Sequence, residues 1–438
     1  MEKKRNNHIA VGLDIGTTTV SAIVMDSGSQ DVLSSYTVPH GADLPAKQPW
    51  EHLQSPQRIW EIVTALLDRI LAQYSVSVIG VTGQMHGVMH TAADGTPLSA
   101  LYTWQDLRAR NGEDSACRKI RELTGYHVPA GYGLATEFAL LLEGKLPPQP
   151  YYACTIMDDI TMRLCGLSRP VMHITNAAAW GLYCHDEQDF DETALQKIGI
   201  PREILPTVIS QKEIVGVYRG IPVAVGIGDN QAAFLGSVTE VENTVLINVG
   251  TGSQVSLLSK ELVPGSLGLI EARPFDGESV LYSGSGLCGG RSYALLEQMF
   301  RKYAVACGLA DEARYEILNA LAAEEWDRKN ILRIRTTFAG TRKDPNMRGE
   351  ILGIGEENFT PGALAIGILY GIVEELYQMY ESMPAHNVTQ LVASGNGVRK
   401  NPLLRNVISE IFGMEAQIPS HTEEAAFGAA IFGADAAL

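Results

Sequence analysis

Two stretches of the chain share one pattern, in which a glycine turn rich in hydroxyl groups separates two apolar runs. In the first stretch the turn is DIGTTT at 14–19, and in the second it is NVGTGS at 248–253. Each copy predicts a β-hairpin. Because a repeat of this kind is typical of paired domains, the sequence predicts two similar lobes that face each other with a ligand in a cleft between them.

Strands and helices alternate along both halves of the chain. Apolar residues at helical spacing predict an amphipathic helix over about 55–74, and Thr360 with Pro361 predicts the start of a helix that reaches about 383. The expected strands lie near 8–13, 20–25, 31–37, 76–82, 221–228, 244–247, 254–258 and 389–393. This alternation predicts an α/β fold with two lobes.

The chain has no low-complexity linker that would mark a flexible tether between lobes. We therefore predict an N-terminal lobe over residues 1–236, with 100–220 as decoration on it, and a C-terminal lobe over 237–438. A hinge without a tether favours closure of the lobes around a ligand.

The two glycine turns are candidates for binding phosphate. Glycine lets the backbone approach an anion closely, and successive N–H groups and hydroxyls supply neutral donors. Either turn alone is more typical of an ordinary hairpin, but the matched pair favours a duplicated phosphate clamp. The predicted phosphate-binding residues are Gly16, Thr17, Thr18, Gly250, Thr251 and Gly252. Asp14 stands where the second copy has Asn248, so a metal ion is expected beside Asp14.

Asp229 is the strongest candidate for a catalytic carboxylate. The apolar strand at 221–228 ends in two glycines and delivers Asp229 and Asn230 to the head of a predicted helix. Such an aspartate acts either as a helix N-cap or as a base facing a cleft, and this segment alone favours neither. In phosphoryl transfer a modest base suffices, because it mainly orients the hydroxyl group.

A second group of polar residues suits a polyhydroxylated sugar, which needs hydrogen-bonding partners and an aromatic face. Taken singly, His86 is more often structural and Trp104 more often a core residue. His86 and His90 lack the glutamate and third ligand of a zinc site. The sugar-binding residues predicted from the segments at 81–87 and 104–108 are Gln84, His86, Trp104, Asp106 and Arg108.

Two further glycine-rich segments have patterns that occur in nucleotide sites. Gly395, Asn396 and Asn401 follow a predicted strand, where the chain can pass close to a flat base. The segment GSGLCG at 284–289 fits a dinucleotide fingerprint, but no second strand ending in an acidic residue follows it, so we do not expect a Rossmann site.

The composition of the chain limits the kinds of partner that it is expected to bind. The 438 residues carry 34 basic and 50 acidic side chains, a net charge of −16, which disfavours nucleic acid and anionic membranes as partners. The six cysteines are scattered, as expected of a reducing compartment. The N-terminal apolar stretch is too short for a signal peptide, and no segment is long enough to span a bilayer. The sequence therefore predicts a cytoplasmic protein.

Over nearly its whole length, the chain resembles the FGGY carbohydrate kinases, members of the superfamily that contains sugar kinases, heat-shock proteins and actin. The matching stretches are GLDIGTTTVSAIVMD, VTGQMHG, TWQDLRAR, GIGDNQAAFLGS, NVGTGSQVS and ASGNGVRKNPLL, in the family's order. The triplet at 84–86 is similar to that of xylulose kinases, whereas residues 154–158, 164–170 and 176–181 are more similar to kinases that act on sedoheptulose.

This resemblance implies two ribonuclease-H-like lobes that bind ATP and Mg²⁺ and phosphorylate the terminal hydroxyl of a ketose. Sedoheptulose is favoured, with xylulose, another pentulose or a polyol as alternatives. Asp229 would be the base and Asp14 would orient the metal. Met85, His86, Trp104 and Asp106 would hold the sugar, with Asn230 beside them, and Gly395, Asn396 and Asn401 would lie by the adenosine. A homodimer is implied as well. An actin-like ATPase without sugar chemistry is the alternative from another class, but the chain shows no appended domain for it.

Overall fold

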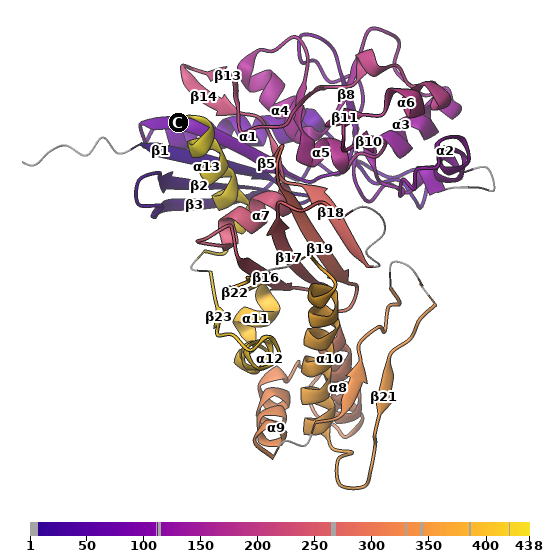
Figure 1. Ribbon diagram of the computed structural model, residues 1–438, viewed down its shortest axis with the longest axis vertical. Coiled ribbons are helices and arrows are strands. Elements are labelled where there is room, and N and C mark those ends of the chain that lie inside the picture. Colours follow the sequence, from indigo (N-terminus) through magenta and orange to yellow (C-terminus); the bar gives the residue numbers. More distant parts are fainter. Residues whose placement is uncertain are drawn as a thin grey trace, which may run out of the picture. The chain divides into compact units, whose positions relative to one another are not determined.

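The computed structural model describes residues 8–110, 112, 115–263, 269–328, 331–341, 344, 346–384, 387–419 and 421–438. The chain divides into two compact units, whose elements are labelled in Figure 1. Unit 1 consists of Met1–Gly236, Arg273–Glu278 and Glu423–Leu438, and unit 2 of Ser237–Ala272 and Ser279–Thr422.

Unit 1 is built on a mixed seven-stranded sheet in which β1 is central. The strand order is β13-β14-β5-β1-β2-β3, and the short β15 also pairs with β5. The strands are β1 (Ile9–Ile15), β2 (Thr19–Asp26), β3 (Val32–Pro39), β5 (Val76–Gly83), β13 (Ile214–Tyr218), β14 (Ile221–Ala224) and β15 (Ile227–Gly228). The principal helices are α1 (Pro56–Leu71), α4 (Ile156–Cys165), α7 (Asp229–Ser237) and α13 (Glu424–Ala436).

Strand β1 is apolar from Ile9 to Leu13, and helices cover both faces of the sheet there. Val11 and Leu13 pack in the cluster that contains side chains of α1 and α4. Ala10 points to the opposite face, as alternation along a strand requires, and packs with α13. The amphipathic helix predicted over 55–74 is α1, with Ser55 as its N-cap.

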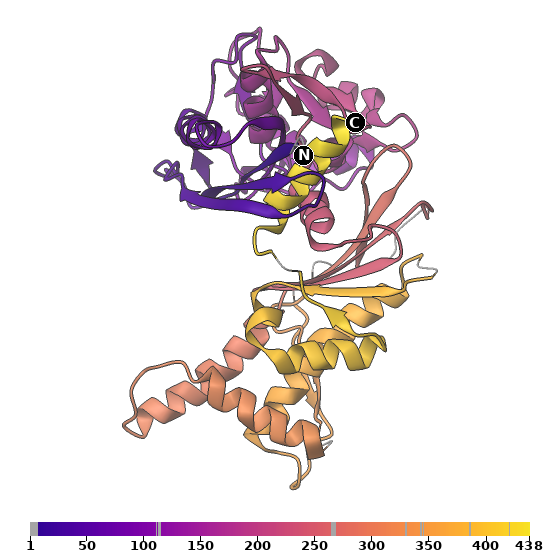
Figure 2. The same ribbon diagram turned by 90° about the vertical axis from the view of Figure 1, so that its left-hand side faces the viewer.

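The C-terminal helix α13 belongs to unit 1, although sequence order places it in the predicted C-terminal lobe at 237–438. The segment Arg273–Glu278 also belongs to unit 1. Figures 1 and 2 show α13, in yellow, against the indigo strands of the unit 1 sheet. Glycines permit the close approach: a Cβ on Gly12 would lie 1.9 Å from the Ala426 carbonyl oxygen, and one on Gly80 would lie 1.8 Å from that of Ala429.

The predicted decoration at 100–220 is part of unit 1 and has a core of its own around the fully buried Trp180. Its helices are α2 (Ala116–Thr124), α3 (Gly133–Leu142), α5 (Ile174–Ala178) and α6 (Glu192–Ile198). Short strand pairs lie in this region or join it to earlier residues of unit 1. They are β4 (Leu53–Gln54) with β7 (Leu101–Tyr102), β6 (Met89–Thr91) with β8 (Tyr152–Cys154), β9 (Val171–His173) with β12 (Thr207–Ile209), and β10 (Tyr183–Cys184) with β11 (Asp189–Phe190).

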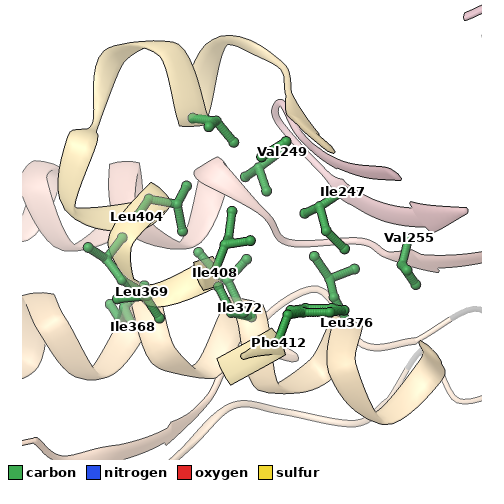
Figure 3. Close-up of a cluster of buried hydrophobic side chains, with 14 of the residues drawn as sticks. Ile247, Val249, Val255, Ile368, Leu369, Ile372, Leu376, Leu404, Ile408 and Phe412 are labelled. Carbon is green, nitrogen blue, oxygen red and sulfur yellow. The ribbon is translucent and has the colours of Figure 1, made fainter. Parts of the chain in front are cut away.

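Unit 2 has a six-stranded sheet in the order β18-β19-β17-β16-β22-β23. Its strands are β16 (Thr244–Val249), β17 (Ser253–Ser259), β18 (Ile270–Pro274), β19 (Val280–Gly286), β22 (Gln390–Ser394) and β23 (Ala416–Gln417), and the last two residues of β18 are counted in unit 1. In addition, β20 (Arg333–Arg335) pairs with β21 (Glu350–Leu352). The helices are α8 (Gly290–Ala306), α9 (Tyr315–Arg328), α10 (Pro361–Glu381), α11 (Asn396–Lys400) and α12 (Pro402–Phe412). Figure 3 shows the core of unit 2, where apolar side chains of α10 and α12 pack against β16.

The two sheets repeat one arrangement around the glycine turns. Asp14 in β1 is opposite Ser21 in antiparallel β2 and Thr82 in parallel β5. Asn248 in β16 is opposite Gln254 in antiparallel β17 and Ser394 in parallel β22. The duplicated α/β fold predicted from the two turns is therefore confirmed.

None of the helices in the described part of the chain combines the length and apolar character that crossing a bilayer would need.

Candidate active site

Three loops meet in unit 1 at the carboxyl ends of neighbouring parallel strands. Gly83 at the end of β5 is opposite Ile15 of β1 on one side and Gly228 of β15 on the other. The turn at 16–18, the turn at 84–86 and Asp229 therefore lie side by side. This edge of a sheet is where ligands bind in open α/β folds.

Asp229 lies at the head of α7 among several hydrogen-bond donors. Its carboxylate accepts hydrogen bonds from the backbone N–H groups of Asn230 and Met85, and the Asn230 Nδ2 lies 3.0 Å from its Oδ1. Burial raises the pKa of Asp229 to about 6, although Arg273 acts in the opposite direction. A carboxyl group with this pKa is ionised at neutral pH and basic enough to accept a proton.

Asp14 lies close to two other carboxylates, those of Asp229 and Glu423. Burial raises its pKa to about 7, and the nearby carboxylates of Asp229 and Glu423 contribute to the rise. A cation beside Asp14 would relieve this repulsion, and carboxylate oxygen is a ligand that Mg²⁺ accepts. The described residues include no group of three acidic, histidine or cysteine side chains placed to hold a metal ion, so such a cation would need ligands from phosphate or water.

The turn after β1 is closed by a hydrogen bond from the Gly16 N–H to the Thr19 carbonyl oxygen, at 2.9 Å. The Trp104 Nε1 donates to the Thr17 Oγ1 at 3.1 Å. Trp104 is 45% exposed, so it is not the core residue that its type alone would suggest. The indole ring therefore lies beside the candidate phosphate turn with much of its surface accessible.

The turn at 84–86 combines two buried residues with a strained histidine. Gln84 and Met85 are almost fully buried, and the Met85 Sδ lies 3.5 Å from the Asn230 Nδ2. His86 has a φ of +74°, a conformation that non-glycine residues rarely adopt. Its Nδ1 lies 2.7 Å from the Ala179 carbonyl oxygen, and its ring stacks on Tyr132 at 4.3 Å. Strain held by surrounding contacts points to a functional role for this turn.

Asp106 and Arg108 are paired with each other in the structure. The Arg108 Nε and Nη2 donate to the two carboxylate oxygens of Asp106 at 2.8 and 3.0 Å, and the His52 N–H donates to the Asp106 Oδ2 at 3.2 Å. Both residues are buried. Both carboxylate oxygens of Asp106 therefore accept hydrogen bonds from the protein, close in sequence to Trp104.

In unit 2, the turn after β16 packs against the head of α8. The Gly290 N–H donates to the Gly250 carbonyl oxygen at 2.9 Å, and the Arg291 N–H donates to that of Thr251 at 3.1 Å. A Cβ on Gly289 would lie 2.2 Å from the Gly252 carbonyl oxygen. Gly289, the last glycine of the 284–289 segment, therefore permits this contact. Strand β19 runs antiparallel to β17, unlike the parallel pair of a Rossmann unit.

A cavity of about 480 Å³ in unit 2 lies beside this turn. Four of the predicted nucleotide residues line it, namely Gly250, Thr251, Asn396 and Asn401. The other lining residues are Gly290, Arg291, Tyr293, Ala294, Tyr315, Asn319, Leu369, Ile372, Gly397, Lys400 and Leu404. The mixture of apolar walls and a few polar groups suits a nucleoside.

The polar groups of this cavity form a connected network. Asn401 caps α12, because its Oδ1 accepts from the N–H groups of Leu403 and Leu404. Its Nδ2 lies 3.2 Å from the Asn319 Oδ1, which also accepts from the Tyr293 hydroxyl at 2.7 Å. Tyr293 and Asn319 come from α8 and α9, and no sequence motif marks them.

Gly252 and Gly395 shape the turns and do not line the cavity. Gly395 has a φ of +90°, and a Cβ there would lie 2.6 Å from the Val249 carbonyl oxygen. In unit 1, Arg273 and Glu423 are charged neighbours of the site that the sequence does not predict. Each lies in a segment that sequence order places in the other lobe, so no local signal could reveal it.

The chain is similar in sequence to known carbohydrate kinases. The family model of the FGGY carbohydrate kinases matches with its N-terminal domain over residues 9–236 and with its C-terminal domain over 245–437. The chain is 26% identical to a sedoheptulokinase of Mus musculus, over 97% of this chain and 96% of the relative. It is also 26% identical to a glycerol kinase of Gloeobacter violaceus, over 96% of this chain and 86% of the relative.

A solved structure of a ligand-bound xylulose kinase from Lactobacillus acidophilus has the same fold. It is 18% identical, covers 98% of this chain and 89% of its own, and has a TM-score of 0.81. Because both family domains match in order and together span nearly all the residues, the chain belongs to the FGGY family of carbohydrate kinases.

Proposed function

We propose that this kinase transfers the γ-phosphate of ATP to the terminal hydroxyl of a ketose, and that the ketose is sedoheptulose, giving sedoheptulose 7-phosphate. The observation that carries the proposal is the position of Asp229. Its carboxylate lies against the Met85 backbone and beside the turn at 16–18, so one carboxylate adjoins both the candidate sugar turn and the candidate phosphate turn.

In this reaction Asp229 would accept the proton of the attacking hydroxyl. Phosphoryl transfer passes through a loose transition state, so the base mainly orients the nucleophile and takes its proton late. Gln84, Met85, His86 and Asn230 would surround the sugar, and the exposed face of Trp104 would pack against its C–H groups. The pair Asp106 and Arg108 would act indirectly, by holding the Trp104 loop.

The phosphates would be bound by the turns at 16–18 and 250–252, with the nucleoside in the unit 2 cavity lined by Asn396 and Asn401. Mg²⁺ fits beside Asp14, where its charge would offset the mutual repulsion of the carboxylates. When bound, Mg²⁺ neutralises charge on the phosphate oxygens and the leaving diphosphate.

The choice of sedoheptulose rests on end-to-end similarity to sedoheptulokinases. The second candidate is a smaller acceptor, a pentulose or a polyol, because glycerol kinases are equally identical to this chain, although they are matched over less of their own length. A few hydroxyl partners decide between such acceptors. We further propose that the enzyme acts in the cytoplasm, as a homodimer.

The experiment is ADP release from ATP in the presence of sedoheptulose, xylulose, glycerol or gluconate, with Asp229→Ala beside the parent protein. Sedoheptulose should give the highest kcat/KM, and Asp229→Ala should abolish the stimulation while ATP still binds. If xylulose or glycerol gives the highest value, the substrate assignment is wrong but the reaction stands. If Asp229→Ala keeps parental turnover, Asp229 is not the base.

A further inference from the structure

The carbonyl oxygens of the turn at 16–18 are held from one side by buried polar groups. The Gln54 Nε2 donates to the Thr17 oxygen at 2.7 Å, and the His40 N–H donates to the Thr18 oxygen at 3.2 Å. The Gly16 oxygen lies 3.3 Å from the His40 Nε2 and 3.4 Å from the Gln84 Nε2. Gln54, His40 and Gln84 are at most 3% exposed.

This arrangement fixes the direction of the N–H groups of the turn. In a trans peptide unit the carbonyl and the following N–H point in opposite directions. With the oxygens of Gly16 and Thr17 held on the protein side, the N–H groups of Thr17 and Thr18 face away from it. Within the described part of the chain, neither of these N–H groups donates to a protein acceptor. They are therefore available to an anion.

The tautomer of His40 follows from its contacts. The Ala42 N–H donates to the His40 Nδ1 at 3.1 Å, so this nitrogen is the acceptor. The Nε2 therefore carries the hydrogen and can donate to the Gly16 oxygen. His40 therefore donates to the turn both from its backbone N–H and from its ring Nε2.

The orientation of two side-chain amides also follows from their partners. The Gln54 Nε2 faces the Thr17 carbonyl oxygen and, at 2.9 Å, the Asp43 Oδ1, and both partners are only acceptors. The Gln54 Oε1 must therefore face Gln84, whose Nε2 donates to it at 2.9 Å. This contact in turn sets the Gln84 amide, so that its Oε1 points away from Gln54.

Gln84 connects this arrangement to the candidate sugar turn. Its backbone N–H donates to the Ile15 oxygen at 2.8 Å, and its Oε1 is buried without a hydrogen-bond partner among the described residues. Gln84 immediately precedes Met85 and His86. A single side chain, Gln54, thus contacts both the phosphate turn and the first residue of the sugar turn.

We propose that Gln54 is a positioning residue for phosphoryl transfer. It holds the turn at 16–18 so that the N–H groups of Thr17 and Thr18 face the terminal phosphate of ATP, and it sets the orientation of Gln84 beside the sugar. Gln54 contacts neither substrate. The inference rests on the proposed kinase function, which assigns the terminal phosphate to this turn and the nucleoside to the unit 2 cavity.

The test uses Gln54→Leu, which removes both hydrogen-bonding groups at similar size, and Gln54→Glu, which keeps an acceptor for Gln84 but offers no N–H to Thr17. We expect kcat to fall by roughly 10- to 100-fold, since misplacing groups around the reacting atoms has effects of this size. ATP affinity should fall relative to ADP affinity, because only ATP has the terminal phosphate. ADP affinity, measured by calorimetry without sugar, should stay at the parental value.

Gln57→Leu is the matched control, because Gln57 is exposed at the start of α1. It should keep parental kcat and parental affinities, and thermal unfolding identifies variants that do not fold. If Gln54→Leu does not fold, the kcat and the nucleotide affinities of Gln54→Glu test the proposal. Parental kcat and an unchanged ratio of ATP to ADP affinity in the folded variants would overturn the proposal, as would equal losses for both nucleotides. A parent protein that no sugar stimulates would instead refute the kinase function, while the affinity ratio would still test Gln54.

Discussion

The backbone N–H of Met85 donates a hydrogen bond to the carboxylate of Asp229. This contact joins the end of β5 to the head of α7 and fixes the candidate sugar turn to the candidate base. Asn230 strengthens the link, since its Nδ2 lies 3.0 Å from the Asp229 Oδ1 and 3.5 Å from the Met85 Sδ. A hydroxyl bound by this turn would meet a carboxylate whose direction is already set, as pre-organised catalysis requires.

The pH dependence of the reaction should follow Asp229. Burial raises its pKa to about 6, so the carboxylate loses its proton, and becomes able to accept one, as the pH rises through 6. We expect kcat/KM to fall about tenfold for each pH unit below 6 and to level off above it. Asp229→Asn should reduce kcat by roughly 10²- to 10⁴-fold. A flat profile between pH 5 and 7 would exclude this assignment.

The sequence predicts those parts of the fold that local pattern determines. The two hairpins, the helix after Ser55 and the position of Asp229 after a buried strand follow from hydrophobic periodicity and turn residues. The return of α13 to unit 1 does not, because it depends on close packing against Gly12 and Gly80, which are distant in sequence. Small residues in that helix indicate tight packing but do not identify the surface it covers.

The candidate site also combines features that local sequence determines with features that depend on contacts between distant segments. Residues at the ends of strands were found because turns with glycine and polar groups are visible in the sequence. Gln54 and Asn319 were missed because their roles arise from hydrogen bonds to distant segments. Asp106 is predicted from its residue type and position to contact the sugar, whereas the structure shows a bidentate contact between its carboxylate and Arg108. Side-chain pairing of this kind cannot be read from residue type.

Asp158 should make the protein less stable as the pH rises. It is fully buried, its Oδ1 has no hydrogen-bond partner among the described residues, and burial raises its pKa to about 7. The folded state therefore holds a proton that the unfolded state releases near pH 4, and stability falls between these values. Asp158→Asn should gain about 1.4 kcal/mol over the parent for each unit between pH 5 and 7. Urea unfolding at several pH values measures this, and a constant difference would contradict it.

Two substitutions of Trp104 should separate its effect on the KM for ATP from its effect on the KM for the sugar. Trp104→Phe removes the hydrogen bond to the Thr17 Oγ1 but keeps a ring, so we expect the KM for ATP to rise by about 3- to 10-fold. Trp104→Ala also removes the aromatic face and should raise the KM for the sugar. Because nearly half of Trp104 is exposed, the thermal midpoint should change little. Steady-state kinetics with each substrate varied in turn provide the test, and parental KM values in Trp104→Ala would rule out this role.

Gly395 should be required for the shape of the unit 2 nucleotide site. Gly395→Ala would strain a residue at φ +90° and place a Cβ 2.6 Å from the Val249 carbonyl oxygen. We expect ADP affinity to fall at least about tenfold, because the turn would have to shift beside the cavity. Gly413→Ala is the matched control: Gly413 has a φ of +65° with no atom within 4 Å of its Cβ position. It should cost about 1 kcal/mol of stability and leave ADP affinity unchanged. Equal ADP affinities in the two variants would show that Gly395 has no such role.

The most direct test of the central claim is the structure of the product formed from ATP and sedoheptulose, determined by phosphorus-coupled NMR. The account predicts a phosphomonoester on the terminal C7 hydroxyl, formed by the parent protein and absent with Asp229→Asn. The absence of any sugar phosphate, in a protein that binds ATP and is offered each of the candidate acceptors, would contradict it.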